Sequence, residues 1–175
     1  MKLVYHPHPS LLKQVQEFDF SKLDAKDIEK QMIEIMNKEH GVGLSANQVD
    51  LDAQIFVMEP KDLEGYKDGQ SFAVINPRIE AVSEQTVLGE EGCLSFPGLF
   101  FKVKRAEALV AKFLDSSGKE CKIEFKGWNA RIFQHEFDHL YGINYIDRVS
   151  KMKLDMAKKK QQKYFKKIKG MITYG

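Results

Sequence analysis

The sequence predicts an α+β fold, in which small and mostly antiparallel β-sheets surround a central helix and a further helix ends the chain. Apolar residues recur at helical spacing in two separate stretches, residues 24–40 and 129–141. Between them lie short apolar runs typical of strands, and a turn at residues 115–118 joins two of these runs. Because the strands follow one another instead of alternating with helices, the pattern favours α+β over a parallel α/β sheet.

The first helix is expected from Asp24 to His40. Its apolar positions lie three or four residues apart, or side by side, at Ile28, Met32, Ile35 and Met36. Asp24 is a suitable N-cap, because its carboxylate can accept amide protons of the first turn. Gly41 is expected to end this helix.

A series of strands is expected after this helix. Residues 54–58 and 71–75 are short apolar runs with strand character, whereas residues 92–98 have the composition of a loop. Residues 102–115 are expected to be extended, and the turn after them leads into a strand at residues 120–126. In this last strand apolar and charged side chains alternate, as in a strand buried on one face, with Cys121, Ile123 and Phe125 on the apolar side.

Two more helices complete the prediction. Asn129 is expected to cap a helix that runs to about Tyr141 and is stopped by Gly142. Helical spacing returns near the C-terminus, at Leu154, Ala157, Gln161, Phe165 and Ile168. The predicted order is therefore helix, strands, helix and tail helix.

Length and composition indicate one globular domain. The chain has 175 residues, of which 43% are hydrophobic and 30% charged. Two cysteines exclude a disulfide framework and favour a reducing compartment. No apolar run approaches the ~18 residues of a membrane span, and the first residues lack the apolar core of a signal peptide. We therefore expect a cytoplasmic protein that does not bind membranes.

The charge is divided unevenly along the chain. Residues 149–175 carry nine lysines and one acidic residue, a charge of +8, so the formal total of +2 leaves −6 for residues 1–148. We expect residues 1–148 to form the domain body and residues 149–175 a basic helical tail of the same domain. Such a tail suits an anionic partner, although lysine-rich helices are often simply solvated.

The strongest chemical signal is the motif His135-Glu136-Phe137-Asp138-His139. Histidines four residues apart lie one turn apart on the same face of a helix, so both imidazoles can reach one ion. Glu136 is then placed to take a proton from a water on that ion, whose pKa a divalent metal lowers to about 7. The motif favours a metal-dependent hydrolase.

A catalytic metal site of this kind needs a third protein ligand. Glu136 is the last glutamate of the chain, which excludes a glutamate further along. Asp147 remains an option, and Cys121 is read as a core residue of its strand. Cys93 lies in a glycine-containing loop, where a thiolate can approach an ion, and a Cys-His-His site with an open fourth position is chemically sound.

A second segment of interest runs from Gly41 to Gln48 and reads G-V-G-L-S-A-N-Q. It could imitate a dinucleotide-binding loop, but such a loop must follow a strand and this segment follows a helix. We expect its glycines to let the backbone pass close to a ligand or a packed helix. Gln48 offers an amide N–H that could stabilise a developing oxyanion.

Three segments taken together resemble the peptide deformylase family, whose members remove the formyl group from nascent N-formylmethionyl chains. The family blocks G-x-G-L-A-A-x-Q, E-G-C-L-S and Q-H-E-x-D-H are matched here at residues 41–48, 91–95 and 134–139, in the same order and with similar separation. The helix before the first block and the basic C-terminal helix also resemble bacterial-type members. The resemblance covers nearly the whole chain, and it makes residues 1–148 the catalytic domain.

The resemblance implies a metal site made by Cys93, His135 and His139. It implies one divalent ion per chain, with Fe(II) the expected metal and Zn(II), Ni(II) or Co(II) able to substitute. Affinity alone would favour zinc over iron, so iron would have to win through availability. An accessible thiolate beside Fe(II) predicts sensitivity to oxygen.

The resemblance also assigns the catalytic groups by matched position. Glu136 would act as general base and later as general acid, while Gln48 and the backbone N–H of Leu94 would form the oxyanion hole. The products would be formate and a free N-terminal methionine. Glu91 and Arg105 match charged positions of the family and are expected to pair and brace the cysteine loop, which requires burial.

The methionine side chain of the substrate needs an apolar pocket. The candidate substrate-binding residues are Val42, Gly43, Leu44, Gly89, Trp128 and Ile132. The sequence departs from the family pattern at Ser45, which replaces an alanine, and at Gly89, Phe100 and Trp128. These departures leave the metal ligands intact and leave preference beyond methionine open.

Expected partners are N-formylmethionyl peptides and, through the basic tail, the ribosome, whose RNA suits the +8 charge; DNA is not expected. One alternative is an endopeptidase of the HExxH type with Asp147 as third ligand, which would keep its metal after Cys93→Ala. A second alternative is a ribosome- or RNA-binding module with a structural metal. It would bind RNA fully after Glu136→Ala and hydrolyse nothing.

Overall fold

We describe a computed structural model that covers the backbone of residues 1–172 and the side chains of residues 1–163. The main elements, in chain order, are α1 (Ala25–Lys38), β1 (Gly43–Ser45), β2 (Ile55–Met58), β3 (Phe72–Val82), β4 (Thr86–Glu91), β5 (Phe101–Ala106), β6 (Ala108–Leu114), β7 (Glu120–Lys126), α2 (Gly127–Leu140) and α3 (Lys151–Ile172). Three 3-10 turns are added: η1 (Pro9–Leu12), η2 (Ala46–Val49) and η3 (Tyr145–Arg148). Among the described residues, no helix has the length and apolar content needed to cross a membrane.

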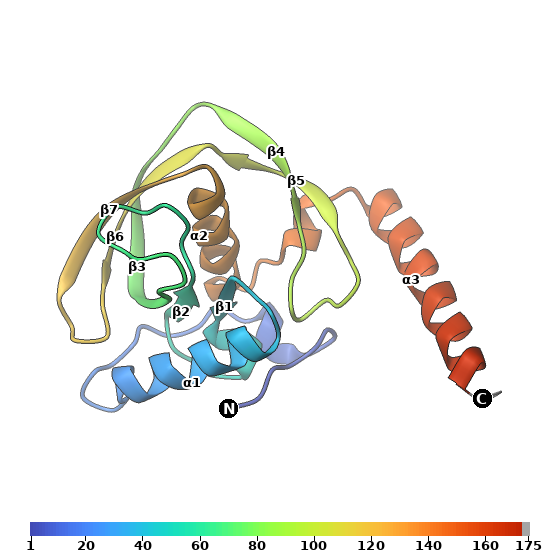
Figure 1. Ribbon diagram of the computed structural model, residues 1–175, viewed down its shortest axis with the longest axis horizontal. Helices are drawn as coiled ribbons and strands as arrows, with labels where there is room; N and C mark the ends of the chain where they lie inside the picture. Colours follow the sequence, from blue (N-terminus) through green and yellow to red (C-terminus); the bar gives the residue numbers. More distant parts are fainter. Residues whose placement is uncertain (173–175) are drawn as a thin grey trace.

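The strands form two antiparallel sheets. Five strands pair in the order β1-β2-β3-β6-β7, and β4 pairs with β5 in a separate ribbon above α2. Figure 1 shows α2 at the centre of the molecule, α1 beneath the sheet and α3 extending along one side. This arrangement confirms the predicted α+β class, with antiparallel sheets around the central helix and a helix at the C-terminus.

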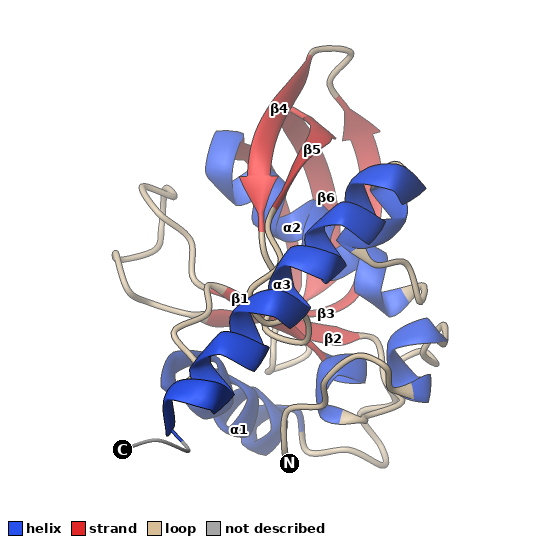
Figure 2. Ribbon diagram, turned by 90° about the vertical axis from the view of Figure 1, so that its right-hand side faces the viewer, coloured by secondary structure: helices blue, strands red, loops and turns tan. Residues whose placement is uncertain are grey.

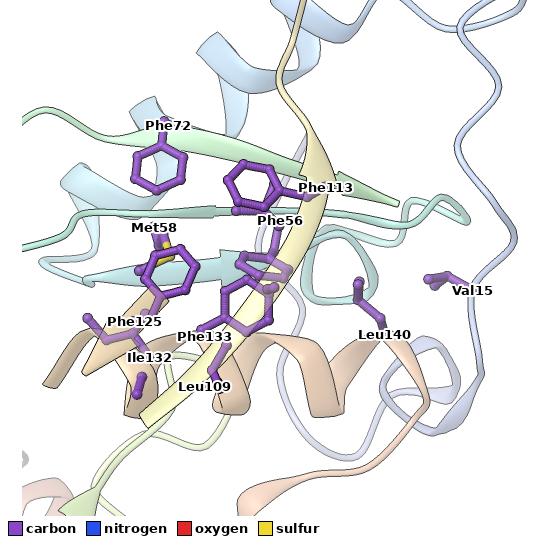
Figure 3. Packing of buried hydrophobic residues seen from close by; sticks show 13 residues of the cluster. Val15, Phe56, Met58, Phe72, Leu109, Phe113, Phe125, Ile132, Phe133 and Leu140 are labelled. Atoms are coloured by element: carbon purple, nitrogen blue, oxygen red, sulfur yellow. The ribbon is translucent and has the colours of Figure 1, made fainter. Parts of the chain in front are cut away.

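The two faces of the large sheet bury separate cores. Along β2, Phe56 and Met58 pack into the cluster that contains α2, while Ile55 and Val57 pack into the cluster that contains α1. Figure 3 shows the first cluster, in which rings such as Phe133 of α2 lie against the strands. A strand covered on both sides reads as a continuous apolar run, which explains why residues 54–58 show no alternation.

Several predicted boundaries change in the structure. The extended stretch 102–115 is two strands, because β5 leaves the β4 ribbon at Ala106 and β6 joins the large sheet at Ala108. The helix at 24–40 is confirmed with Asp24 as its cap, but His40, and not Gly41, takes the left-handed conformation after it (φ 57°).

The start of α2 also differs from the prediction. The helix begins at Gly127, so Asn129 lies inside its first turn and does not cap it. The Asn129 side chain instead bonds the backbone of Lys61 in both directions, at 2.9 and 2.8 Å. Gly142 follows the helix with a φ of 72°, as expected of a residue that ends a helix.

The tail helix α3 confirms the helical spacing near the C-terminus, although the side chains of Phe165 and Ile168 lie outside the described ones. Leu154 and Ala157 pack against a third cluster that includes Phe96 of the loop after β4. The Gln161 amide donates to the carbonyl of Pro97 in the same loop. Figure 2 shows α3 lying across this side of the molecule.

The two ends of the body are also joined. The Asn144 amide donates to the carbonyl of Leu11 at 3.0 Å, and the amide of Val15 donates to the carbonyl of Leu140 at 2.9 Å. These contacts hold the N-terminal segment against the end of α2, although the paired residues are more than a hundred positions apart in the sequence.

Phe133 should be among the most sensitive core positions. Its ring is fully buried and meets Phe56 edge to face, with 5.2 Å between the ring centres. Phe133→Ala should lower the free energy of unfolding by about 3–5 kcal/mol, because it leaves a cavity between α2 and the sheet. Urea-induced unfolding measures this loss, and Met152→Ala on the exposed side of α3 is the control, expected to stay within about 0.5 kcal/mol of the parent.

Candidate metal centre

Cys93, His135 and His139 converge on one point. Helix α2 supplies both histidines from adjacent turns, and the loop after β4 brings the cysteine above them. The Cys93 Sγ lies 3.4 Å from His139 Nε2, and the two Nε2 atoms are 3.3 Å apart. All three ligand atoms lie within 4.8 Å of one another. In the part of the chain that the structure describes, these three residues are the group of His, Cys, Asp or Glu side chains placed to hold a metal ion.

Glu91 fixes the ring of His135. The Nδ1 of His135 lies 3.0 Å from Glu91 Oε2. Burial alone would raise the pKa of Glu91, but hydrogen bonds from His135 and Arg105 hold it far below its usual range, so the group is an ionised acceptor. The proton of His135 must therefore sit on Nδ1, which leaves Nε2 free to bind an ion on the side of Cys93.

The electrostatics of the site fit a cation. Burial would lower the pKa of His135, but contacts with Cys93 and Glu91 and the charge of Glu136 outweigh it and raise the pKa to about 10. Groups that stabilise a positive charge at this point would stabilise a divalent ion in the same way. A thiolate with two imidazoles is also a donor set that zinc and iron accept.

A buried network of charged side chains holds Glu91 in place beside His135. Arg105 makes two hydrogen bonds to the Glu91 carboxylate, both 2.9 Å, and also contacts Asp138 of α2. Glu91 and Arg105 are 6% and 4% exposed, so the pair has the burial that bracing requires. Arg148 closes the network on the other side of Asp138, at 2.6 and 2.7 Å.

Glu136 lies directly beside the ligand cluster. Burial raises its pKa to about 7, against the opposing effects of His135 and the Ser45 hydroxyl. Within residues 1–172, Glu136 Oε2 is buried and has no hydrogen-bond partner, so it is free to hold a proton or to bind a water. A Cβ on Gly43 would overlap the carboxylate, so the glycine lets β1 pass close to this group.

Gln48 and Leu94 complete the surroundings of Cys93. The Gln48 amide nitrogen lies 3.3 Å from Cys93 Sγ and 3.2 Å from Ser95 Oγ, and the residue is 1% exposed. Leu94 follows the cysteine directly and packs against Gly41, where a Cβ would come within 2.7 Å of its side chain. Residues 41–48 and 91–95 therefore lie together beside the helical motif at residues 134–139.

A cavity of about 580 Å³ opens onto these groups. Of the substrate-binding candidates, Val42, Gly43, Trp128 and Ile132 line it. Leu44 does not, because it is fully buried in the core under α1. Gly89 does not line it either and lies against Arg131 instead.

Arg131 is a cavity residue that sequence reasoning missed. Its guanidinium donates to the carbonyls of Val87 and Val103 and to Glu91, at 2.8 to 2.9 Å, and so fastens α2 to the β4–β5 ribbon. A Cβ on Gly89 would lie 2.7 Å from this group, so the glycine makes room for it. The available signal was an arginine on the otherwise apolar face of the helix before His135, four residues from the first ligand.

The rival ligand positions lie elsewhere. The Asp147 carboxylate accepts the backbone N–H of Asn144 at 2.8 Å within η3 and is not part of the metal-holding group. Cys121 lies on β7 and packs on the edge of the cluster around Phe125. This geometry gives no support to an endopeptidase with Asp147 as third ligand.

Comparison with known proteins identifies the family. The family model for polypeptide deformylase matches residues 1–155 of the 175. The chain belongs to the peptide deformylase family. The match supports neither the endopeptidase alternative nor the structural-metal alternative.

Individual deformylases agree with this assignment. Peptide deformylase of Wolbachia from Brugia malayi is 36% identical over 94% of this chain and 95% of its own length. The chloroplast enzyme 1B of rice is 34% identical over 99% of this chain, which spans 65% of that protein's length. The crystal structure of Ehrlichia chaffeensis peptide deformylase in complex with actinonin superposes with a TM-score of 0.81, at 37% identity over 94% of this chain and 96% of that one.

The two cysteines offer a matched test of the ligand set. Cys93→Ala should remove the bound metal, because two imidazoles alone hold a divalent ion weakly at this site. Cys121→Ala should keep about one ion per chain, since this cysteine lies on β7 and is not part of the metal-holding group. Elemental analysis after gel filtration measures both, and a Cys93→Ala protein that kept its full metal content would show that another residue is the third ligand.

Proposed function

We propose that this deformylase hydrolyses the N-formyl bond of peptides that begin with formylmethionine, releasing formate. The observation that supports it most directly is the cluster of Cys93, His135 and His139, of which Cys93 and His135 line the cavity, with the buried and unpartnered Oε2 of Glu136 beside it. Because the chain spans about two thirds or less of the plant relatives' lengths, its substrate is part of this proposal.

In this proposal Cys93, His135 and His139 hold one divalent metal ion. When bound, such an ion supplies Lewis acidity and lowers the pKa of a water to about 7. Fe(II) is the proposed metal, with Zn(II), Ni(II) or Co(II) as substitutes. The half-buried thiol of Cys93, exposed to the cavity, makes oxidation of this ligand a hazard in the iron form.

The chain's own groups would then carry the proton and the charge. Glu136 takes the proton of the attacking water and returns it to the departing amine, a role suited to a carboxyl whose pKa lies near neutrality. The Gln48 amide and the Leu94 backbone N–H donate to the oxygen that becomes negative, and one such donor can be worth about 3 kcal/mol. Formyl selectivity is steric, because a carbon bearing only hydrogen fits where a larger acyl group collides.

Val42, Trp128 and Ile132 would receive the methionine side chain. Ile132 is 4% exposed and joins the core, whereas Trp128 is 50% exposed at the mouth. A flexible thioether fits an apolar wall of this kind. Arg131 also lines this cavity, but its guanidinium is already bonded to Glu91 and to the carbonyls of Val87 and Val103.

Formate release tests the proposed activity. Protein purified anaerobically with Fe(II) should release formate from a formyl-Met-Ala peptide, and Glu136→Gln should lower kcat about 100- to 10,000-fold while the metal stays bound. The glutamine has almost the same shape, so the loss would reflect the missing proton acceptor.

Two results would contradict this proposal. Absence of formate from wild-type protein that contains one ion per chain would reject the substrate. A Glu136→Gln protein as active as wild type would reject Glu136 as the base.

We also propose that residues 149–175 form a basic tail of the catalytic domain, which comprises residues 1–148. This tail would bind ribosomal RNA, and the protein would work in the cytoplasm. Lys159, Lys160 and Lys163 are exposed on α3, on a helix whose Leu154 and Ala157 are docked on the body. Phosphate attracts such a surface without base recognition. The free thiols of Cys93 and Cys121 suit a reducing compartment.

Removing charge from the tail tests the ribosome proposal. Substitution of Lys159, Lys160 and Lys163 by Gln keeps the docked face and should weaken binding to ribosomes at low salt. In a plot of log binding constant against log salt concentration, the negative slope should become shallower by about two to three, roughly one for each lysine. Cosedimentation measures this, with activity on a short formyl peptide as the control that should not change. Unchanged binding would reject the tail as the contact.

A further inference from the structure

Ser45 lies between the core and the metal centre, at the junction of β1 and η2. It is fully buried, and its hydroxyl oxygen is 2.9 Å from Gln48 Oε1 and 3.0 Å from Asn47 Oδ1. The family pattern has alanine at this position, so the hydroxyl is a feature that the three sequence blocks do not explain.

The contacts of Ser45 decide which way the Gln48 amide points. The oxygen and nitrogen of a glutamine amide are nearly the same size, so their positions follow from the surrounding donors and acceptors. Ser45 presents two donors to the same atom, its backbone N–H at 2.9 Å and its hydroxyl at 2.9 Å. The backbone N–H can only donate, so it requires an oxygen there, and the hydroxyl then donates to the same oxygen. This turns the NH₂ group toward Cys93 and Ser95.

We infer that Ser45 is a positioning residue for the reaction, holding the Gln48 amide with its N–H groups directed at the metal centre. The inference rests on the proposed function, in which Gln48 donates to the developing oxyanion. A donor of this kind is effective when it is already oriented before charge develops. Without the hydroxyl, Gln48 Oε1 keeps only the backbone N–H of Ser45 as a donor, so the amide is held less firmly in this orientation.

Asn47 and Glu136 offer the competing explanations. Asn47 Nδ2 donates to the carbonyl of His139, so its orientation is set from the other side. The one hydroxyl proton of Ser45 faces two amide oxygens and also acts on the carboxylate of Glu136. If the proton served Asn47 or Glu136, loss of the hydroxyl would act on α2 and not on Gln48. The two routes differ in whether the effect of Ser45 requires Gln48.

A double-mutant cycle separates these routes. Ser45→Ala should lower kcat about 3- to 10-fold with little change in KM, the loss of one hydrogen bond that matters in the transition state. In a Gln48→Ala background the same substitution should change kcat less than twofold. Ser10→Ala is the matched control, because it removes another buried serine hydroxyl, bonded to the Asn47 carbonyl at 2.8 Å, and should leave kcat unchanged.

Two kinetic outcomes would overturn the inference. An equal loss of kcat in both backgrounds would place the effect on Glu136, on Asn47 or on the fold. No loss in the wild-type background would show that the hydroxyl positions nothing. Wild-type protein that releases no formate would instead count against the proposed function.

An NMR measurement tests the inference without activity. In zinc-loaded protein, the side-chain amide protons of Gln48 are the pair missing from the spectrum of Gln48→Ala. Ser45→Ala should shift this pair and speed its exchange with water, while Ser10→Ala should not. An unchanged pair in Ser45→Ala would overturn the inference even if the chain acts on another substrate.

Discussion

The buried carboxylate of Glu91 is the interaction on which the rest of the structure depends. It accepts hydrogen bonds from Arg105, Arg131 and His135, and so joins β4, β5 and α2 at one point. A buried charge costs several kcal/mol of desolvation unless it is fully paired, so the strand ribbon, the helix and the imidazole must all take their places together. The cysteine loop begins directly after this residue, which ties the metal site to the same joint.

Helix α2 both packs on the sheet and supplies two metal-binding histidines, and its helical repeat places these residues on different faces. One face of the helix packs on the sheet with residues such as Phe133 and Leu140, and another face presents His135 and His139 to the metal centre. The aromatic core on one side therefore fixes the rotation of the helix, and the rotation sets the direction of both imidazoles. For these two histidines, the packing of α2 on the sheet therefore determines the geometry of the metal site.

Much of this could be predicted from the sequence, because local rules govern it. Capping by Asp24, the hairpin after Leu114 and the i, i+4 histidines depend on neighbours in the chain. Local rules do not predict contacts between segments that lie far apart in the sequence. The division of residues 102–115 between two sheets, the role of Asn129 in holding Lys61, and the place of Arg131 against Gly89 each depend on a partner far away in sequence. Leu44 faces the core and not the cavity, and a strand buried on both faces gives no sign in its sequence of which face turns toward a cavity.

The bond from Asn144 to the carbonyl of Leu11 has a consequence for biosynthesis. Contacts of such long sequence separation form late, because closing a large loop must precede any gain from the contact. The site draws groups from β1, from the loop after β4 and from α2, so it assembles only when nearly the whole body has left the ribosome. During its own translation the chain passes through a long period in which its helices and hairpins can exist but its reaction centre cannot.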